Sequence, residues 1–195
     1  MTTEPQLQGW KEFCDKHHKD PNFFEPSIAR NLNRFRARYL AALNFQSIQM
    51  DRASENLKRG YSVGIRLLLS YTAAEVLGSA IGPRIKSWKI YDPKIVRAIR
   101  DICKKYTDDQ DAISEKKLAS LLLAFTNGEH DDLRVPATAL RVLVAHGHFA
   151  PSGAVYTKRN ADAVYGLSSR LLAESERRFT SWLDEQLASE DCNNP

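Results

Sequence analysis

The chain has 195 residues, of which 43% are hydrophobic and 27% are charged. This composition is typical of a soluble globular protein and excludes a disordered or fibrous one, and the length predicts one compact domain, alone or in a small oligomer. The 28 Lys and Arg residues exceed the 24 Asp and Glu residues, so the net charge is +4, which permits a phosphate-bearing partner but does not require one.

The N-terminal region predicts a short helix followed by a long one. Gln6–Lys16 is a short helical candidate, which the polar residues 17–20 should end before Pro21. We interpret residues 1–25 as an N-terminal arm or lid. A long helix begins at Pro26 and reaches at most to Met50, because apolar side chains recur at three- and four-residue spacings at Ile28, Leu32, Phe35, Tyr39 and Leu43.

The middle of the chain predicts two further helices. Residues Tyr61–Ile81 leave little polar surface, which is typical of a central helix that neighbours surround, and Gly82-Pro83 should end it. Residues Pro93–Tyr106 carry apolar side chains at helical spacing. An acidic loop follows, with Asp108, Asp109 and Asp111.

Two helices follow the acidic loop. Ser114 is placed to cap a helix that runs to Phe125, and Asn127-Gly128 should close it. The next helix spans Pro136–His146, because proline is suited to the first turn of a helix. Gly147 is suited to the left-handed conformation that terminates a helix, so it should end this one.

The C-terminal region predicts one more helix and completes the fold class. After a loop at 151–153, apolar positions at helical spacing span Asn160–Leu187, and residues 189–195 form a polar tail. Because no segment shows the sustained alternation of a strand, we predict an all-α protein: an antiparallel helical bundle of about five core helices, residues 26–188, with an N-terminal helical extension. The tryptophans are expected to be packing anchors, at Trp10, Trp88 and Trp182.

One short segment carries side chains suited to chemistry. Arg141 and His146 lie near the end of an apolar helix, and His148 follows. Five residues of ideal helix turn His146 by about 140° from Arg141 and raise it by about 7.5 Å, so the two side chains cannot lie side by side. They can still converge on one ligand if Gly147 turns His146 back toward Arg141. A histidine can take the proton of a ribose 2′-hydroxyl or protonate a leaving oxygen, and a guanidinium can stabilise charge on phosphorus. The pair therefore suits metal-independent RNA cleavage, and the alternative is an ordinary surface pair at a helix end.

The residues around this pair resemble a known motif. Residues 139–149, Ala-Leu-Arg-Val-Leu-Val-Ala-His-Gly-His-Phe, followed by Pro-Ser-Gly at 151–153, look like the Arg-x4-His signature of the HEPN superfamily, whose helical bundle carries the motif just before its last helix. Upstream, residues 71–77, Tyr-Thr-Ala-Ala-Glu-Val-Leu, are similar to the pattern in the central helix of these domains. The similar segments cover roughly residues 61–187.

The resemblance implies a metal-independent RNA endonuclease, acting as a toxin or defence effector, that dimerises so that two motifs face one cleft. It implies catalytic roles for Arg141 and His146 and a weaker role for Glu75. By its residue type His148 could assist as a second acid or base, and the alternative is a solvated loop histidine. Glu75 would orient Arg141 or His146, and the alternative is an acid at the edge of the bundle. The implied partners are RNA, a second copy of the chain and an antitoxin or defence-system protein, and no cofactor is implied.

Two positions depart from patterns in the family. Val142 follows the arginine, where many active members have a polar residue. His148 stands where the branch paired with nucleotidyltransferase antitoxins has a tyrosine, which argues against that branch. Val142 favours the alternative function, a non-catalytic HEPN-like module for RNA binding or protein interaction.

A basic helical face is a second candidate site. Arg30, Arg34 and Arg38 are four residues apart and share one face of the predicted helix. This face could follow an RNA backbone or meet acidic residues of a partner, and the alternative is a solvated charged face. The same basic region is extended by Arg52, Lys58 and Arg59.

The remaining histidines and cysteines predict no metal or cofactor site. The histidines lack the i, i+4 ligand spacing of zinc proteases. The widely spaced cysteines favour neither a disulfide framework nor a zinc knuckle and fit a reducing compartment; they are Cys14, Cys103 and Cys192. The first residues lack the pattern of a signal peptide, and no apolar run approaches the ~18 residues of a membrane helix. We therefore expect a cytoplasmic protein with no membrane partner.

Overall fold

The computed structural model describes residues 6–107, 113–149 and 157–191, and all regular elements in these ranges are helical. The prediction of an all-α helical bundle is confirmed. Three predicted features lie outside the described residues: the acidic loop at Asp108, Asp109 and Asp111, the loop at 151–153, and Cys192.

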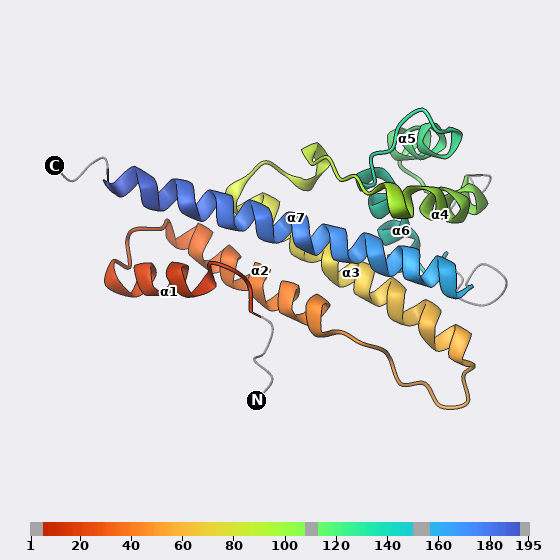
Figure 1. Cartoon of the computed structure of the whole chain (residues 1–195), viewed down its shortest axis with the longest axis horizontal. Coiled ribbons are helices and arrows are strands. Elements are labelled where there is room, and N and C mark those ends of the chain that lie inside the picture. The colour runs from red at the N-terminus through yellow and green to blue at the C-terminus, as the bar shows by residue number, and fades with distance from the viewer. Residues whose placement is uncertain (1–5, 108–112, 150–156, 192–195) are drawn as a thin grey trace.

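Seven helices make up the described fold, with two short 3-10 turns between them. In chain order they are α1 (Trp10–Lys19), α2 (Pro26–Asn44), α3 (Glu55–Ile81), η1 (Ile85–Ser87), α4 (Pro93–Cys103), η2 (Lys104–Tyr106), α5 (Lys116–Asn127), α6 (Arg134–Ala145) and α7 (Lys158–Asp191). The long helices α2, α3 and α7 lie side by side and give the molecule its elongated shape, while α4, α5 and α6 gather near the N-terminal half of α7 (Figure 1).

The long helices differ in direction. Helix α2 runs antiparallel to α3, whereas α7 runs in the same direction as α3 (Figure 1). Arg66 of α3 stacks on Tyr165 near the start of α7, and Trp88, just beyond the end of α3, packs under Arg178 further along α7. The connection that contains α4, α5 and α6 makes this parallel pairing possible, because it carries the chain back along the bundle before α7 begins.

Several helix ends follow the local signals in the sequence. Helix α2 begins at Pro26 and α3 ends at Ile81, next to Gly82, as predicted. Gly128 and Gly147 end α5 and α6 with φ angles of 84° and 74°, in the left-handed region that glycine adopts without a steric penalty.

Other predicted bounds are wrong. Helix α1 begins at Trp10 and continues through the two histidines to Lys19. Helix α2 ends at Asn44, within the predicted limit of Met50. Helix α3 begins six residues before Tyr61, because the Ser54 side chain caps it by accepting a hydrogen bond from the Leu57 N–H. Ser114 does not cap α5, which begins at Lys116, and residues 189–191 of the predicted tail are helical.

The predicted N-terminal arm packs on the bundle. Phe13 of α1 is 1% exposed, and its ring lies 6.3 Å from the ring of Phe179 on α7. The Gln8 N–H also donates to the Glu176 carboxylate at 3.0 Å. The side chains of α1 are therefore part of the same hydrophobic core as the long helices.

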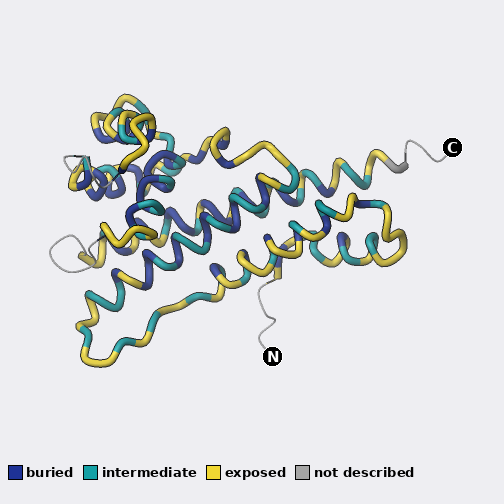
Figure 2. Tube along the Cα trace, turned by 180° about the vertical axis from the view of Figure 1, so that it is seen from behind, coloured by how far each residue is buried: buried dark blue, intermediate teal, exposed yellow. Residues whose placement is uncertain are grey.

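Buried residues follow the faces on which the long helices meet, and the connection between α2 and α3 contains none (Figure 2). Trp88 is almost fully buried, and Trp10 and Trp182 pack against the core from its edge. Within the described ranges, no helix has the length and apolar character needed to cross a membrane.

Candidate functional site

Arg141 leaves α6 toward α3 and meets two side chains there. Its Nη2 donates to Glu75 Oε2 at 3.4 Å, and its guanidinium carbon lies 5.5 Å from the centre of the Tyr71 ring. Burial raises the pKa of the Tyr71 hydroxyl, which lies 3.0 Å from the Thr138 hydroxyl of α6. The side chains of Arg141 and Glu75 are 33% and 39% exposed, so the ion pair stays open to solvent.

His146 and His148 lie in the turn that ends α6. The His146 N–H donates to the Val142 carbonyl at 3.0 Å, and the Phe149 N–H donates to the Leu143 carbonyl at 3.1 Å. Phe149 is buried, whereas both histidines are exposed. The turn is therefore anchored by Phe149 and presents His146 and His148 to solvent.

Arg141 and the turn that carries His146 lie against different stretches of α3. Val144 and Phe149 pack against Gly64, where an added Cβ would lie 3.4 Å from both of them. Tyr71 and Glu75, which Arg141 contacts, lie seven and eleven residues beyond Gly64, or about 10 and 16 Å along an ideal helix. No hydrogen bond joins Arg141 to His146 in the part of the chain that the structure describes. Within one copy, the two side chains therefore sit at different levels of α3.

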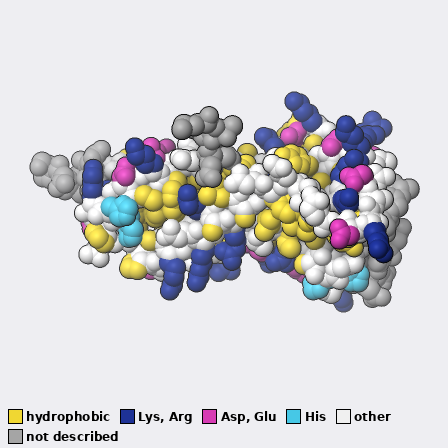
Figure 3. Space-filling view, turned by 90° about the horizontal axis from the view of Figure 1, so that it is seen from below, with side chains coloured by type: hydrophobic (Ala, Val, Ile, Leu, Met, Phe, Trp, Pro, Cys, Tyr) yellow, Lys and Arg dark blue, Asp and Glu magenta, His cyan; other side chains and the backbone are white. Residues whose placement is uncertain are grey.

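The basic face of α2 is exposed, as the spacing of its arginines indicated. Lys and Arg side chains form a row along one edge of the molecule in the view from below (Figure 3). Arg34 and Arg38 line a groove against α3, whereas Arg30 and Arg34 border a neighbouring hollow between α1 and α2 that also contains His17. The three predicted arginines thus serve two adjacent surfaces, with Arg34 on both.

The groove between α2 and α3 brings together residues from three elements, and we name it the Glu75 groove. Its volume is about 460 Å³, and the side chains that matter here are Arg34, Arg38, Glu75, Ser79, Arg84 and Lys86. The four basic side chains form no ion pair within the described ranges. Glu75 is the acid of the groove, and its carboxylate already pairs with Arg141. The groove therefore carries an excess of positive charge.

Sequence reasoning missed Arg84 and Lys86, which form the second wall of the Glu75 groove. These residues approach α3 because position 78 is glycine: a Cβ there would lie 3.0 Å from the Ile85 nitrogen and 3.1 Å from the Arg84 Cα. The usable signal was Gly78 itself, a glycine within an otherwise well-formed helix, which indicates a close backbone approach.

The other predicted positions have structural surroundings. The His130 ring packs 5.8 Å from the ring of Phe125 and its Nδ1 accepts from the Asp132 N–H. Lys58 pairs with Glu55 at 2.9 Å and, with Arg59, lines a different pocket from the Glu75 groove. Neither of these two residues extends the basic groove. Cys103 is buried, and this burial strongly raises the pKa of its thiol, which disfavours the nucleophilic thiolate.

Among the described residues, no group of three or more His, Cys, Asp or Glu side chains could hold a metal ion. Comparisons of the chain with protein-family models, with curated proteins and with solved structures found no match.

Proposed function

We propose that this protein binds RNA in the Glu75 groove and cleaves it without a metal ion, as an endonuclease of HEPN type that uses Arg141 and His146. One observation carries the proposal: Glu75 lines the basic groove and also pairs with Arg141. The basic face of α2 and the arginine of the motif are about a hundred residues apart in sequence, and Glu75 joins them into one continuous surface.

The charge of this surface favours a polyanion. Four cationic side chains line the groove together with Glu75, and a fifth, Arg141, pairs with it. Solvent-exposed cations gain affinity for RNA by neutralising phosphates. Glu75 also restrains the Arg141 guanidinium at the end of the groove. A restrained guanidinium needs less ordering when it binds the phosphate that will be cleaved.

The proposed reaction uses the 2′-hydroxyl of the RNA. His146 takes the proton of this hydroxyl, the 2′-oxygen attacks phosphorus, and the 5′-oxygen of the next nucleotide leaves with a proton from His148 or water. Arg141 stabilises the charge that develops on the phosphate. The products are a 2′,3′-cyclic phosphate and a 5′-hydroxyl.

A homodimer agrees with the geometry. In one copy, Arg141 and the turn that carries His146 lie at levels of α3 about 10 to 16 Å apart, so a second copy that places its His146 opposite Arg141 would complete the site. A toxin or defence effector remains the proposed biological role. It predicts slower growth of cells that express the wild type than of cells that express the His146→Ala variant.

The test is cleavage of single-stranded RNA by purified protein. His146→Ala should lower the cleavage rate by about 10²–10⁴-fold, the typical contribution of acid–base catalysis. His18→Ala is the matched control, because His18 is also exposed but lies on α1, and it should cleave like the wild type. Sequencing of the RNA ends should find cyclic phosphates. Cleavage by His146→Ala at the wild-type rate would refute the proposal.

A second candidate, a non-catalytic RNA-binding module, is favoured by one observation. Arg141 is already engaged by Glu75, and it lies away from the turn that carries His146. The apolar Val142 after the arginine also favours this candidate. This candidate predicts RNA binding that depends on Arg34 and Arg38 with no cleavage by the wild type. The same RNA assay, with binding and cleavage measured together, separates the two candidates.

A further inference from the structure

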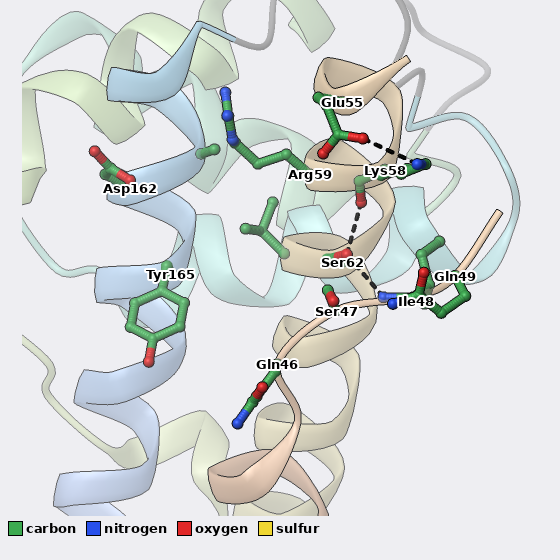
Figure 4. Close-up of a pocket in the computed structure, with 12 residues that line it drawn as sticks. Gln46, Ser47, Ile48, Gln49, Glu55, Lys58, Arg59, Ser62, Asp162 and Tyr165 are labelled. Carbon is green, nitrogen blue, oxygen red and sulfur yellow. Dashed lines mark hydrogen bonds and ion pairs between the residues drawn. The ribbon is translucent and has the colours of Figure 1, made fainter. Parts of the chain in front are cut away.

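A second pocket lies between α3, the start of α7 and the connection between α2 and α3. Its volume is about 420 Å³. Tyr165 of α7 and Arg59 of α3 stand on either side of it, with Gln46 of the connection below them (Figure 4). Val63 contributes an apolar side chain to its lining. This pocket, which we name the Tyr165 pocket, has no role in the function proposed above.

Tyr165 is an exposed aromatic side chain that is held in place from behind. It is 49% exposed, and the guanidinium carbon of Arg66 lies 3.7 Å from the centre of its ring. Arg66 is itself fixed, because its Nε donates to the Ala42 carbonyl of α2 at 3.1 Å. One face of the Tyr165 ring is thus covered by a cation, which leaves the other face as a rigid stacking surface.

Arg66 is also a buried charge without a counter-ion. Arg66 is only 4% exposed. Within the described ranges it forms no ion pair, and its Nη1 has no hydrogen-bond partner. Buried charges in folded proteins are normally paired, since an unpaired one is costly. The positive charge behind the Tyr165 ring therefore favours electron-rich or negative groups at the open face of the ring.

The charged residues that line the pocket support this interpretation. Glu55 is paired with Lys58 at 2.9 Å. Arg59 donates a hydrogen bond to the Asn56 side chain, and its charge adds to that of Lys58 in lowering the pKa of Glu55. The two acids of the lining, Glu55 and Asp162, balance its two bases, Lys58 and Arg59. The cation left in excess is Arg66, which lies against the Tyr165 ring and is not part of the lining.

We propose that the Tyr165 pocket binds one unpaired nucleotide. The base stacks on the open face of Tyr165 beside Val63, the Gln46 amide reads an edge of the base, and Arg59 contacts the phosphate. A volume of about 420 Å³ is in the range of small-molecule sites. A base within a duplex has no free face for such stacking, so the ligand is a nucleotide of a single strand or a free nucleotide.

The position of the pocket connects it to the motif. Val63 lines the pocket, and the adjacent Gly64 contacts Val144 and Phe149 of the turn that carries His146. A nucleotide held there is at the same level of α3 as His146. Where the nucleotide belongs to an RNA strand, this inference depends on the proposed function, and it identifies the substrate as single-stranded RNA.

The test measures fluorescence anisotropy of a labelled single-stranded RNA with full-length protein in the His146→Ala background, which keeps the RNA intact. Tyr165→Ala should weaken binding about tenfold, since stacking of one base contributes about that much, and Tyr165→Phe should bind like the parent because it keeps the ring. Tyr91→Ala is the matched control: Tyr91 is 55% exposed outside the pocket. The same sequence as a duplex should bind equally to the parent and to Tyr165→Ala.

A second variant keeps the test valid if Tyr165→Ala does not fold. Arg59→Gln leaves the ring in place and should also weaken binding of the single strand. Wild-type affinity of both Tyr165→Ala and Arg59→Gln for the single strand would overturn the strand as ligand.

Adenosine monophosphate, titrated by calorimetry, tests the free nucleotide. Binding that requires Tyr165, with strand binding unaffected, would assign the pocket to a free nucleotide. Independence of both ligands from Tyr165 would overturn the inference. Neither arm requires cleavage, so failure of the proposed nuclease activity would be recognised separately.

Discussion

The salt dependence of RNA binding gives the sharpest test of the Glu75 groove. Four cations face the groove without acidic partners among the described residues: Arg34, Arg38, Arg84 and Lys86. Each phosphate of a single strand that a cation neutralises contributes about 0.7 to the slope of log affinity against log salt concentration. Four such contacts predict a slope of about −2.8, which is a loss of about 50-fold in affinity between roughly 50 and 200 mM salt.

Removing two of the four cations should halve this slope. The double variant Arg34→Ala/Arg38→Ala is expected to show a slope of about −1.4 and a loss of only about 7-fold over the same range. Its control is Lys116→Ala/Lys117→Ala, because these lysines are exposed on α5 and their loss changes the net charge equally. Anisotropy titrations of a labelled single strand at several salt concentrations measure the slopes. Equal slopes for the two double variants would refute a groove-specific contact.

Three further predictions concern the scaffold. Gly78→Ala, whose Cβ would meet backbone atoms of the following turn at 3.0–3.1 Å, should destabilise the protein by about 1–3 kcal/mol in urea unfolding and weaken RNA binding. Phe13→Ala should cost about 3–5 kcal/mol and expose α1 to trypsin; unchanged stability would show that α1 is not part of the core. Burial raises the pKa of Glu174, but its bonds to Arg177 and Arg178 lower the pKa by more, so the net pKa is below the ordinary 4.5. The stabilisation by Glu174 is therefore present above that ordinary pKa and is lost as the pH falls through the lowered pKa. Glu174→Gln should therefore make unfolding less sensitive to acid, as measured by urea unfolding from neutral pH downward.

The Glu75 carboxylate has two consequences for the proposed site. It restrains Arg141, and it places one negative charge among the groove cations. The side chains of Arg141 and Glu75 are 33% and 39% exposed. Such a solvent-exposed ion pair contributes at most about 1 kcal/mol to stability. A phosphate can therefore compete with Glu75 for the guanidinium at modest cost.

Much of the helix pattern was readable from the sequence, because the forces that start and end helices are local. Gly82, Gly128 and Gly147 end helices where the residue type predicts it, and Pro26 begins α2. Apart from the predicted Ser114 cap, the failures occurred where polar residues stay helical. Helix α7 continues past Leu187 through charged residues, since a long helix that is already packed can extend beyond its apolar stripe.

For the candidate site, the sequence identified the individual residues, and the tertiary structure determined which of them lie together. The sequence by itself singled out Arg141, His146 and Glu75 through a motif, and the arginines of α2 through their spacing. Only the tertiary structure joined them. Glu75 pairs with Arg141 because α6 packs on α3. Arg34 lies across the groove from Arg84, and Gly78 allows the close approach that forms this groove.

The Tyr165 pocket was not predictable at all, because Arg66 and Tyr165 are nearly a hundred residues apart and meet through the parallel packing of α3 and α7. Residue spacing reports which side chains share one face of one helix. Which faces of different helices meet depends on the packing of the whole chain, and that is decided by tertiary contacts.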